Sequence, residues 1–184
     1  MIYRPIILDE EIKFSKKKFV VSKTDVEGNI LFVNKNFCDI TGYGHQELMG
    51  QPHSVLRHPD MPKAIFYMIW KSLFAGMEVS AIVKNVAKSG KYYWVIADFS
   101  MQRDNHGKLE TFTSFKRAAP EYVSKGIEDL YHGMISAERK GGMEASLLFL
   151  EMFLEDKQMS YGEYLEDLVE EKGVFSSWMK RLKK

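Results

Sequence analysis

The chain of 184 residues has a single cysteine, Cys38, and no long apolar run. One cysteine cannot form an intrachain disulfide, and it excludes a zinc site built from several cysteines. The longest apolar stretch, residues 64–70, is far shorter than the roughly 20 residues of a membrane-spanning helix. The sequence turns acidic at Asp9, too early for a signal peptide. We therefore expect a soluble, cytoplasmic protein that does not insert into a membrane itself, although a membrane-bound partner could hold it there.

An excess of charge of one sign is also missing, because 26 Lys and Arg stand against 25 Asp and Glu. A dedicated duplex-DNA binder is usually much more basic, so we expect no nucleic-acid partner. The charge is nevertheless divided along the chain. Residues 1–118 hold 12 acidic and 17 basic residues, whereas residues 119–184 hold 13 acidic and 9 basic ones. This division indicates either ordinary surface solvation or a basic anion-holding domain followed by an acidic docking segment.

Motifs of the common enzyme classes are absent as well. The sequence contains no P-loop, no dinucleotide-binding glycine fingerprint and no nucleophile elbow. The acidic pairs Glu155-Asp156 and Glu166-Asp167 are adjacent residues in predicted helices, so their side chains point in different directions. They are typical of a solvated helix face and not of paired catalytic carboxylates. We predict that the protein is not an enzyme.

What the first 118 residues do contain is a regular order of strand and helix patterns. Two short strands come first, then several short helical segments, then a longer helix that Pro62 opens and Gly76 ends. Three strands follow, separated by the turns Ser89-Gly90 and residues 104–107. The order predicts an α+β fold with helices across one face of a sheet. The predicted strands are residues 18–24, 29–33, 78–88, 91–103 and 108–116.

From Pro120 onward the pattern is helical. We predict helices over 121–140 and 143–158 with a break at Gly141-Gly142, a third from Ser160 to Glu171, and a last one over 174–182. The two middle helices are too apolar to stand free, so they pack on each other, on the sheet or on a partner. The predicted organisation is an N-terminal segment (1–17), an α+β domain (18–118) and a helical extension (119–184).

The segment richest in chemistry is Gly-Gln-Pro-His-Ser-Val-Leu-Arg-His-Pro-Asp-Met-Pro, residues 50–62. Its three prolines stiffen the backbone from which the polar side chains project. Arg57 can donate two hydrogen bonds to a phosphate, His58 is beside it, and a helix N-terminus follows within a few residues. These residues are suited to holding an anion. The alternative is structural, with Asp60 capping the helix and pairing with Arg57.

The same segment resembles the signature of flavin-binding PAS domains of the aerotaxis-receptor (Aer) type. Three stretches over residues 18–118 carry the resemblance: Ser-Lys-Thr-Asp to Thr-Gly-Tyr (22–43), Glu-Leu-Met-Gly to Trp (47–70), and Val-Lys-Asn followed by Gly-Lys-Tyr-Tyr-Trp-Val (83–95). The run Arg-His-Pro-Asp-Met-Pro is the narrowest of these motifs. The resemblance implies a PAS fold, which is a five-stranded antiparallel sheet with helices across one face, followed here by an all-helical C-terminal extension.

The resemblance also implies FAD held without a covalent bond between the helices and the sheet. Asn34, Arg57, His58 and Asp60 occupy positions that the family needs for FAD binding. At further matching positions, Trp70, Asn85 and Tyr93 are expected to line the pocket. An isoalloxazine ring needs amide groups for its pyrimidine edge, and Asn85 in an otherwise strand-forming segment suits that purpose.

One position departs from the family pattern. Where the family has Trp-x-Gly after the long helix, this sequence has Val79-Ser80-Ala81. This variant is similar to the soluble single-PAS partners (CetB type) of bipartite energy-taxis receptors, which also carry a helical extension. The implied function is a redox or oxygen sensor for energy taxis. It would relay the flavin's redox state to a membrane-bound methyl-accepting chemotaxis-type receptor or a similar signalling protein, as a single chain or as a homodimer.

The residues argue against one further interpretation and leave two others open. A blue-light photosensor would need a thiol on the segment His53–Leu56, and Cys38 lies elsewhere. A gas sensor holding haem b is a second alternative, since the chain has eleven methionines and five histidines that could serve as axial ligands. A ligand-free PAS interaction module is the third. The histidines are His45, His53, His58, His106 and His132.

Overall fold

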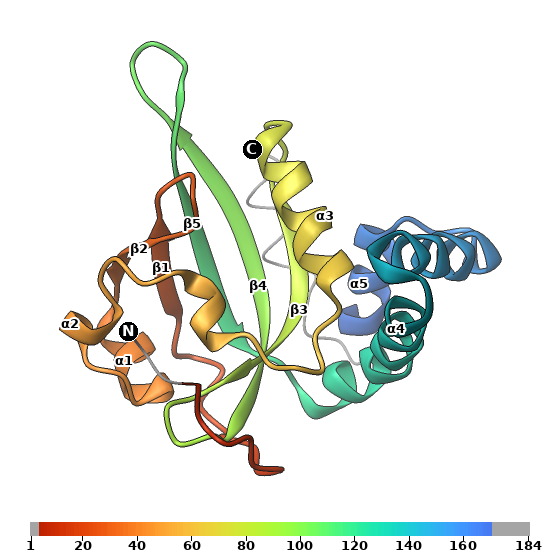
Figure 1. The fold of residues 1–184 in the computed structure, drawn as a ribbon, viewed down its shortest axis with the longest axis horizontal. Helices are drawn as coiled ribbons and strands as arrows, with labels where there is room; N and C mark the ends of the chain where they lie inside the picture. Colours follow the sequence, from red (N-terminus) through yellow and green to blue (C-terminus); the bar gives the residue numbers. More distant parts are fainter. Residues whose placement is uncertain (1–3, 171–184) are drawn as a thin grey trace. The chain divides into compact units, whose positions relative to one another are not determined.

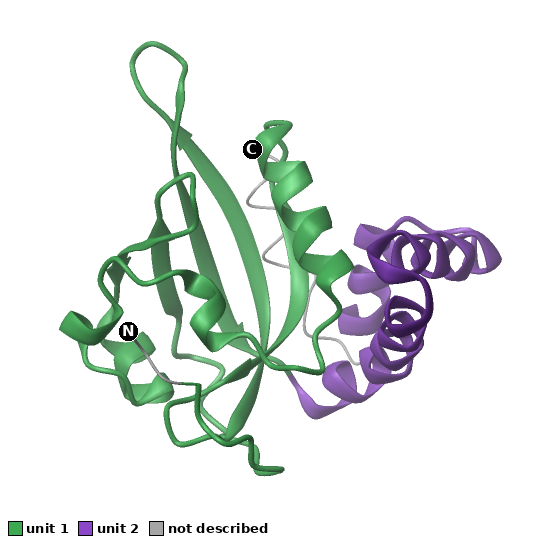
Figure 2. Ribbon diagram, viewed as in Figure 1, with its two compact units in different colours: residues 1–119 green, residues 120–184 purple. Residues whose placement is uncertain are grey.

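The computed structural model describes residues 4–170, and it divides the chain into two compact units, residues 1–119 and 120–184 (Figure 2). The first unit contains the predicted N-terminal segment and the α+β domain. The second contains the predicted helical extension. The helix expected over residues 174–182 and the basic C-terminal tail lie outside the described residues.

The first unit is built on a five-stranded antiparallel sheet with the strand order β2-β1-β5-β4-β3 (Figure 1). Strand β1 thus pairs with both β2 and the last strand, β5, while β2 and β3 form the two edges of the sheet. The fold class predicted from the sequence is confirmed. The strands are β1 (Val20–Thr24), β2 (Ile30–Val33), β3 (Val79–Val86), β4 (Tyr92–Arg103) and β5 (Leu109–Ala118).

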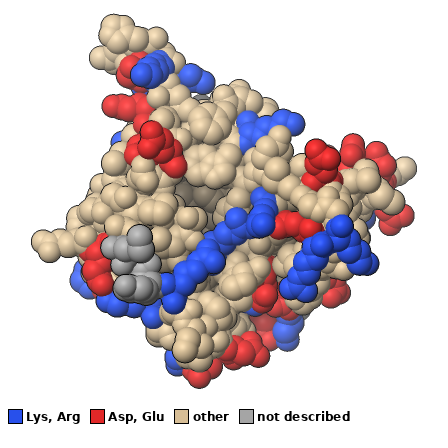
Figure 3. Space-filling model, viewed as in Figure 1, with Lys and Arg blue, Asp and Glu red and all other residues tan. Residues whose placement is uncertain are grey.

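Alternation along β4 separates the two faces of the sheet. Successive strand residues point to opposite faces, so Tyr93 and Phe99 share one face while Trp94 and Asp98 share the other. The hairpin of β4 and β5 extends beyond the other strands in Figure 1. Charged side chains of both signs cover this hairpin in Figure 3, as suits a ribbon exposed to water on all sides.

Helices cross one face of the sheet (Figure 1). Asn34 caps the first of them, because its side-chain oxygen accepts hydrogen bonds from the N–H groups of Val21 (3.1 Å) and Phe37 (3.0 Å). Proline precedes two others: Pro52 stands before a 3-10 turn, and Pro62 is the residue just before α3, the longest helix of the first unit. The elements are α1 (Lys35–Thr41), α2 (His45–Leu48), the 3-10 turn η1 (His53–Leu56) and α3 (Lys63–Phe74).

The N-terminal segment lies against the start of β4. The N–H of Leu8 donates to the carbonyl of Gly90 (2.9 Å), the N–H of Tyr92 donates to the carbonyl of Glu10 (2.9 Å), and the N–H of Ile12 donates to Tyr92 (2.7 Å). Gly90 has a φ of +87°, and a Cβ at this position would collide with the carbonyl oxygen of Ile6. Glycine therefore serves both the turn and the close approach of the N-terminal segment.

The second unit consists of α4 (Glu121–Lys157) and α5 (Tyr161–Glu170). The predicted break is confirmed, because Gly141 and Gly142 leave the helical conformation inside α4, Gly142 with a φ of +73°. A capping box begins α5: Ser160 N–H donates to Glu163 (2.7 Å), and Glu163 N–H donates to the Ser160 hydroxyl (3.2 Å).

Tyrosines hold α5 on the first half of α4. The hydroxyls of Tyr131 and Tyr161 are 3.0 Å apart, and the Tyr164 hydroxyl donates to the carbonyl of Gly126 (3.1 Å). The Tyr164 ring also meets Phe153 of the second half edge-on, with ring centroids 5.2 Å apart. The unit is thus a helical cluster with internal contacts of its own. No helix within residues 4–170 has the length and apolarity needed to cross a membrane.

Candidate ligand-binding cavity

A cavity of about 250 Å³ lies in the first unit between the sheet and the helices η1 and α3. Its mouth is the hollow visible near the middle of Figure 3, bordered there mainly by uncharged atoms. The volume is close to the lower end of the range for small-molecule sites, roughly 300–1,000 Å³. Its lining side chains include Ser22, Thr24, Glu27, His53, Ser54, Arg57, Phe66, Ile69, Trp70, Leu73, Val83, Asn85, Phe99, Phe112, Ser114 and Lys116.

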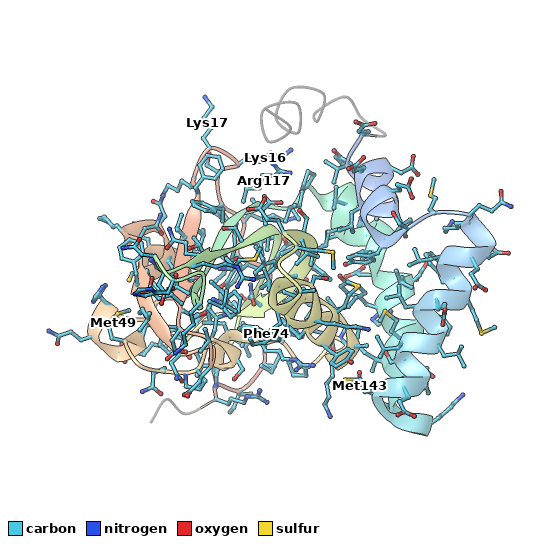
Figure 4. The ribbon with its side chains drawn as sticks, turned by 90° about the horizontal axis from the view of Figure 1, so that it is seen from above. Lys16, Lys17, Met49, Phe74, Arg117 and Met143 are labelled. Carbon is cyan, nitrogen blue, oxygen red and sulfur yellow. The ribbon has the colours of Figure 1, made fainter. Side chains whose placement is uncertain are left out.

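Aromatic rings form one part of the wall. Trp70 of α3 meets Phe112 of β5 edge-on, with ring centroids 5.0 Å apart and an interplanar angle of 79°. Phe74 follows Trp70 by one helical turn and also packs edge-on against Phe112. Figure 4 shows Phe74 on the opposite side of the sheet from Arg117 of β5, in agreement with the alternation of that strand. Trp70 and Phe112 line the cavity and make an apolar surface that suits a flat, apolar ring system, whereas Phe74 packs on them from outside the lining.

Arg57 contributes a positive charge to the wall. Its guanidinium carbon lies 4.5 Å from the centre of the Phe66 ring, and it donates a hydrogen bond to the carbonyl of Met61 (3.1 Å). The backbone of Arg57 forms a bridge with Asn85 of β3. The segment after η1 is therefore attached to the edge of β3, and Arg57 is held by contacts on both sides.

A second basic group, Lys116, lies on β5. Its amine donates to the hydroxyl of Ser22 (2.8 Å), and that hydroxyl is 3.0 Å from Nε2 of His53. Burial lowers the pKa of Lys116 to about 7. Burial and the positive charge of Lys116 lower the pKa of His53 to about 3. His53 is therefore neutral at pH 7, and its Nε2 can accept the proton of the Ser22 hydroxyl.

Two polar groups on the wall have unused hydrogen-bonding capacity. Asn85 is only 3% exposed, and its amide nitrogen has no hydrogen-bond partner within residues 4–170. The hydroxyl of Ser114 on β5 is also buried and also has no hydrogen-bond partner within these residues. An unmade hydrogen bond of a buried polar group costs roughly 1–3 kcal/mol. Two of them on the wall of one cavity indicate that a polar ligand completes the site.

Three of the predicted site residues, Arg57, Trp70 and Asn85, line this cavity. Asn34 is not among its lining residues. Its side chain caps α1 and donates to the carbonyl of Phe19 (2.9 Å). The role that the structure shows for Asn34 is to join α1 to β1, beneath the helices that cover the cavity.

His58 and Asp60 are not among the lining residues either, and they meet Lys84. The Asp60 carboxylate is 3.0 Å from the Lys84 amine, and Nδ1 of His58 accepts from the N–H of Asp60 (3.1 Å). Burial, with the charge of Lys84, lowers the pKa of His58. Because Lys84 and Asn85 are neighbours in β3, their side chains point to opposite faces of the sheet. The signature segment, residues 50–62, therefore contacts both faces of the sheet: Arg57 lies on the cavity side, and Asp60 contacts Lys84 on the other.

Tyr93 shares the cavity face with Asn85, its partner across β3 and β4, but it is not among the lining residues. Its ring meets Phe14 edge-on at 6.3 Å, and burial strongly raises the pKa of its hydroxyl. Val79, the position at which the resemblance implies tryptophan, pairs with the cavity residue Phe99 and shares its face. An indole at position 79 would therefore lie beside Phe99, at the end of the cavity that Phe99 lines.

The sequence interpretation missed Ser22, His53, Ser114 and Lys116. A signal for the last two was present, since Phe112, Ser114 and Lys116 alternate along β5 and so share one face. Of the five histidines, His53 lines the cavity, whereas Cys38 of α1 is not among the lining residues. No cluster of His, Cys, Asp and Glu suited to a metal ion occurs within residues 4–170.

Residues 30–115 match the family model described as PAS fold. With the strand order and the helices over one face, this match shows that the first unit has the PAS fold. Solved light-oxygen-voltage domains share its fold. One, studied with a flavin analogue, has a TM-score of 0.53 and 22% identity over 59% of this chain and 82% of that one. Another, from the photoreceptor Aureochrome1, has a TM-score of 0.52 and 20% identity over 60% of this chain and 88% of that one.

Among characterised sequences, the aerotaxis receptor of Escherichia coli strain K12 is 35% identical over 134 residues, which are 73% of this chain and 26% of the receptor. The biofilm dispersion protein BdlA of Pseudomonas aeruginosa is 31% identical over 86 residues, which are 46% of this chain and 21% of that protein. The chain thus spans about a quarter of the length of these relatives. The sequence resemblance to the aerotaxis-receptor type of PAS domain is confirmed.

Proposed function

We propose that the chain is a sensor whose PAS domain binds FAD without a covalent bond and relays the redox state of the flavin, or oxygen, to a signalling partner. The observation that carries this proposal is the buried amide nitrogen of Asn85, which has no hydrogen-bond partner in the described part of the chain and lies on the wall of a cavity with an aromatic surface. Such an amide suits the pyrimidine edge of an isoalloxazine ring. The resemblance to an aerotaxis receptor favours the same ligand class.

The residues present fit such a ligand. Trp70, Phe66 and Phe112 offer apolar surface to a flat ring. Arg57 offers a guanidinium group to a phosphate, with its position fixed by Met61 and by the bridge to Asn85. His58 and Asp60 would then act indirectly, by holding the segment that carries Arg57 against Lys84. The flavin, when bound, supplies the electron-accepting chemistry.

A route from the cavity to the other face of the sheet runs through β3. A change in the hydrogen bonds of Asn85 acts on the backbone of β3, to which the segment after η1 is attached through Arg57. The side chain of Lys84, the residue before Asn85, lies on the far face of the sheet, where its amine donates a hydrogen bond to the Asp60 carboxylate. For a signal to leave the site, the oxidised and the reduced flavin must favour different arrangements of these residues. We infer that the ion pair of Lys84 and Asp60 reports on the cavity.

The proposed setting is the cytoplasm, and the chain itself has no catalytic role. The partner is a membrane-bound methyl-accepting chemotaxis-type receptor or a similar signalling protein, in the manner of the CetB-type single-PAS proteins. The helices of the second unit are the proposed output element, either for this partner or for a second copy of the chain. Apolar side chains exposed on α4, such as Leu148 and Met152, are available for either contact.

Purified full-length protein tests the proposal by its visible spectrum and by its uptake of added FAD. The flavin spectrum in the protein fraction is the expected result, and FAD retention should fall at least tenfold in Arg57→Ala, since bidentate hydrogen bonds to charged groups contribute roughly 1.5–3 kcal/mol each. Arg103→Ala, in the exposed β4–β5 hairpin, is the matched control and should retain FAD. A protein that takes up no FAD, or that carries a haem spectrum, would sink the proposal.

A further inference from the structure

Lys116 is a buried cation without a described counter-charge. Its side chain is 2% exposed, and no carboxylate within residues 4–170 forms an ion pair with it. Burying a charged amine without a partner is costly, and here the cost appears as a pKa lowered to about 7. The amine therefore exchanges a proton near neutral pH more readily than an ordinary lysine.

The groups around Lys116 offer no negative charge. The Ser22 hydroxyl accepts from the lysine amine and has one proton of its own, which it can donate to Nε2 of neutral His53, 3.0 Å away. His53 of η1 is neutral at pH 7 because burial and Lys116 lower its pKa. Arg57, on the same cavity wall, is positive, and Glu27 lies in an exposed position. From α1, the Phe37 ring is 5.4 Å from the amine. The cavity lining thus carries two basic side chains, Arg57 and Lys116, against the exposed carboxylate of Glu27, and it is complementary to an anion.

The register of the sheet places Lys116 beside a flat surface. Lys116 pairs with Ala97 of β4, and Ala97 pairs with Ala81 of β3. Residues directly opposite one another in antiparallel strands share a face, so Ala97 alone lies between Lys116 and Ala81 of the edge strand β3. Val83 and Asn85 follow on the same face of β3. A flat ring that lies on this face of the sheet has Asn85 on one side and Lys116 on the other.

This inference rests on the proposed flavin. We propose that Lys116 is the residue by which the cavity distinguishes the charge states of the flavin: its ammonium group balances the negative charge that reduction places on the ring, so the reduced form binds more tightly than the oxidised form. Two electrons from an external donor and one proton convert the neutral oxidised ring into an anion protonated at N5. A second proton from solvent resides on Lys116, which is partly neutral before reduction.

Protonation would also reach the protein. A neutral lysine amine can accept a hydrogen bond from Ser22, whereas an ammonium can only donate one. The direction of the hydrogen bonds from Lys116 through Ser22 to His53 then depends on the charge in the cavity. These three residues belong to β5, β1 and η1, so the charge state is coupled to three elements of the PAS domain at once.

The test compares four full-length proteins loaded with FAD: wild type, Lys116→Met, Lys116→Arg and the control Lys23→Met. Lys23 is next to Ser22 in β1 and points to the other face of the sheet. The dissociation constants of oxidised FAD and of dithionite-reduced FAD are measured under anaerobic conditions, with the spectrum of the reduced form. In the ligand-free protein, the lysine amines are titrated by NMR.

In Lys116→Met, we expect the preference for reduced over oxidised FAD to fall by about tenfold or more, which corresponds to one pKa unit of differential interaction. The spectrum of the reduced flavin should change from the anionic to the neutral form. Lys116→Arg should keep the wild-type preference, and Lys23→Met should match wild type. The Lys116 amine should titrate well below the ordinary lysine pKa of about 10.4.

An unchanged preference in Lys116→Met, an equal loss of both forms of FAD, or a Lys116 amine with an ordinary lysine pKa would each overturn the inference and leave the flavin proposal standing. A wild-type protein that binds neither form of FAD defeats the proposed function itself. If Lys116→Met does not fold, as judged by circular dichroism, Lys116→Gln takes its place in the same comparison.

Discussion

Two buried lysines on opposite faces of the sheet show how the same residue type serves different purposes. The Lys84 amine is 3.0 Å from the Asp60 carboxylate and 4.4 Å from the centre of the Tyr92 ring, so burial is offset by an ion pair and a cation–π contact. Lys116 has the Ser22 hydroxyl and, 5.4 Å away, the Phe37 ring, but no carboxylate among residues 4–170. A buried charge retained without an ion pair lowers stability, and functional sites are where proteins accept that loss.

The cost of Lys116 predicts a pH dependence of stability in the ligand-free protein. Its pKa is about 7 when folded and 10.5 when unfolded, so between these values the unfolded chain binds more protons. The free energy of unfolding should therefore rise with pH across this window, by at most about 1.4 kcal/mol per pH unit. Lys116→Met should be more stable than wild type at pH 7, and its advantage should shrink toward pH 10.

Urea denaturation of both proteins at several pH values measures this difference. Lys23→Met is again the control, because it should show the same pH dependence as wild type. Parallel stability curves for wild type and Lys116→Met between pH 7 and pH 10 would show that Lys116 is not the source of the effect.

Val79 predicts a gain of binding at the other end of the cavity. It is half-buried, pairs with Phe99 and shares the face of that cavity residue. In Val79→Trp, the indole adds flat aromatic surface, and aromatic contacts contribute roughly 0.5–1.5 kcal/mol beyond burial. FAD should therefore dissociate about threefold to tenfold more slowly, as followed by flavin fluorescence after dilution. Val79→Leu adds bulk without a flat ring and should not reproduce the effect; unchanged or faster release from Val79→Trp would contradict the argument.

At the scale of elements, the features with local signals were predictable. The break at Gly141-Gly142 and the cap by Ser160 and Glu163 depend on residues adjacent in sequence, and both are present. The faces met by the signature segment were not predictable, because they depend on the backbone bridge between Arg57 and Asn85. That contact joins residues far apart in the chain, and it places Arg57 at the cavity while Asp60 reaches Lys84.

The N-terminal segment shows the same limit. Its pairing with residues 90–92 depends on space above Gly90, which no periodicity in the sequence reports. The sequence predicted the kind of cavity but only some of the residues that line it. Arg57, Trp70 and Asn85 were found through the family resemblance, whereas Lys116 belongs to no motif, and its place in the cavity depends on the pairing of β5 with β1 and β4.

Gly90 predicts a selective loss of this pairing. In Gly90→Ala, the new methyl group meets the Ile6 carbonyl, so the segment must leave β4. Hydrogen exchange should accelerate at the amides of Leu8 and Ile12, which donate to residues of the turn and β4. Gly107→Ala is a matched control, because Gly107 also has a positive φ (+78°) but has no atom within 4 Å of the added Cβ. Equal exchange in the two variants would mean that backbone strain alone, and not the collision, is responsible.

At the scale of the whole molecule, charge and architecture divide at the same place. The structure separates residues 1–119 from residues 120–184, and the sequence separates a net charge of +5 in residues 1–118 from −4 in residues 119–184. The positive unit holds the cavity with its two cations. The negative unit is a helical cluster fastened by its own tyrosines. Ligand binding and output are thus assigned to different parts of the chain.

This assignment predicts that the first unit binds its ligand alone. Every residue that lines the cavity falls within residues 22–116, and every strand of the sheet ends before Pro120. A fragment of residues 1–119 should therefore fold with the circular dichroism of an α+β domain and bind FAD within about threefold of the full chain, a difference of less than 1 kcal/mol. Affinity capture with the candidate receptor should succeed with the full chain and fail with the fragment, because the fragment lacks α4 and α5. A fragment that folds but releases FAD would show that the helical unit supports the cavity, and the division of labour between the two units would then be wrong.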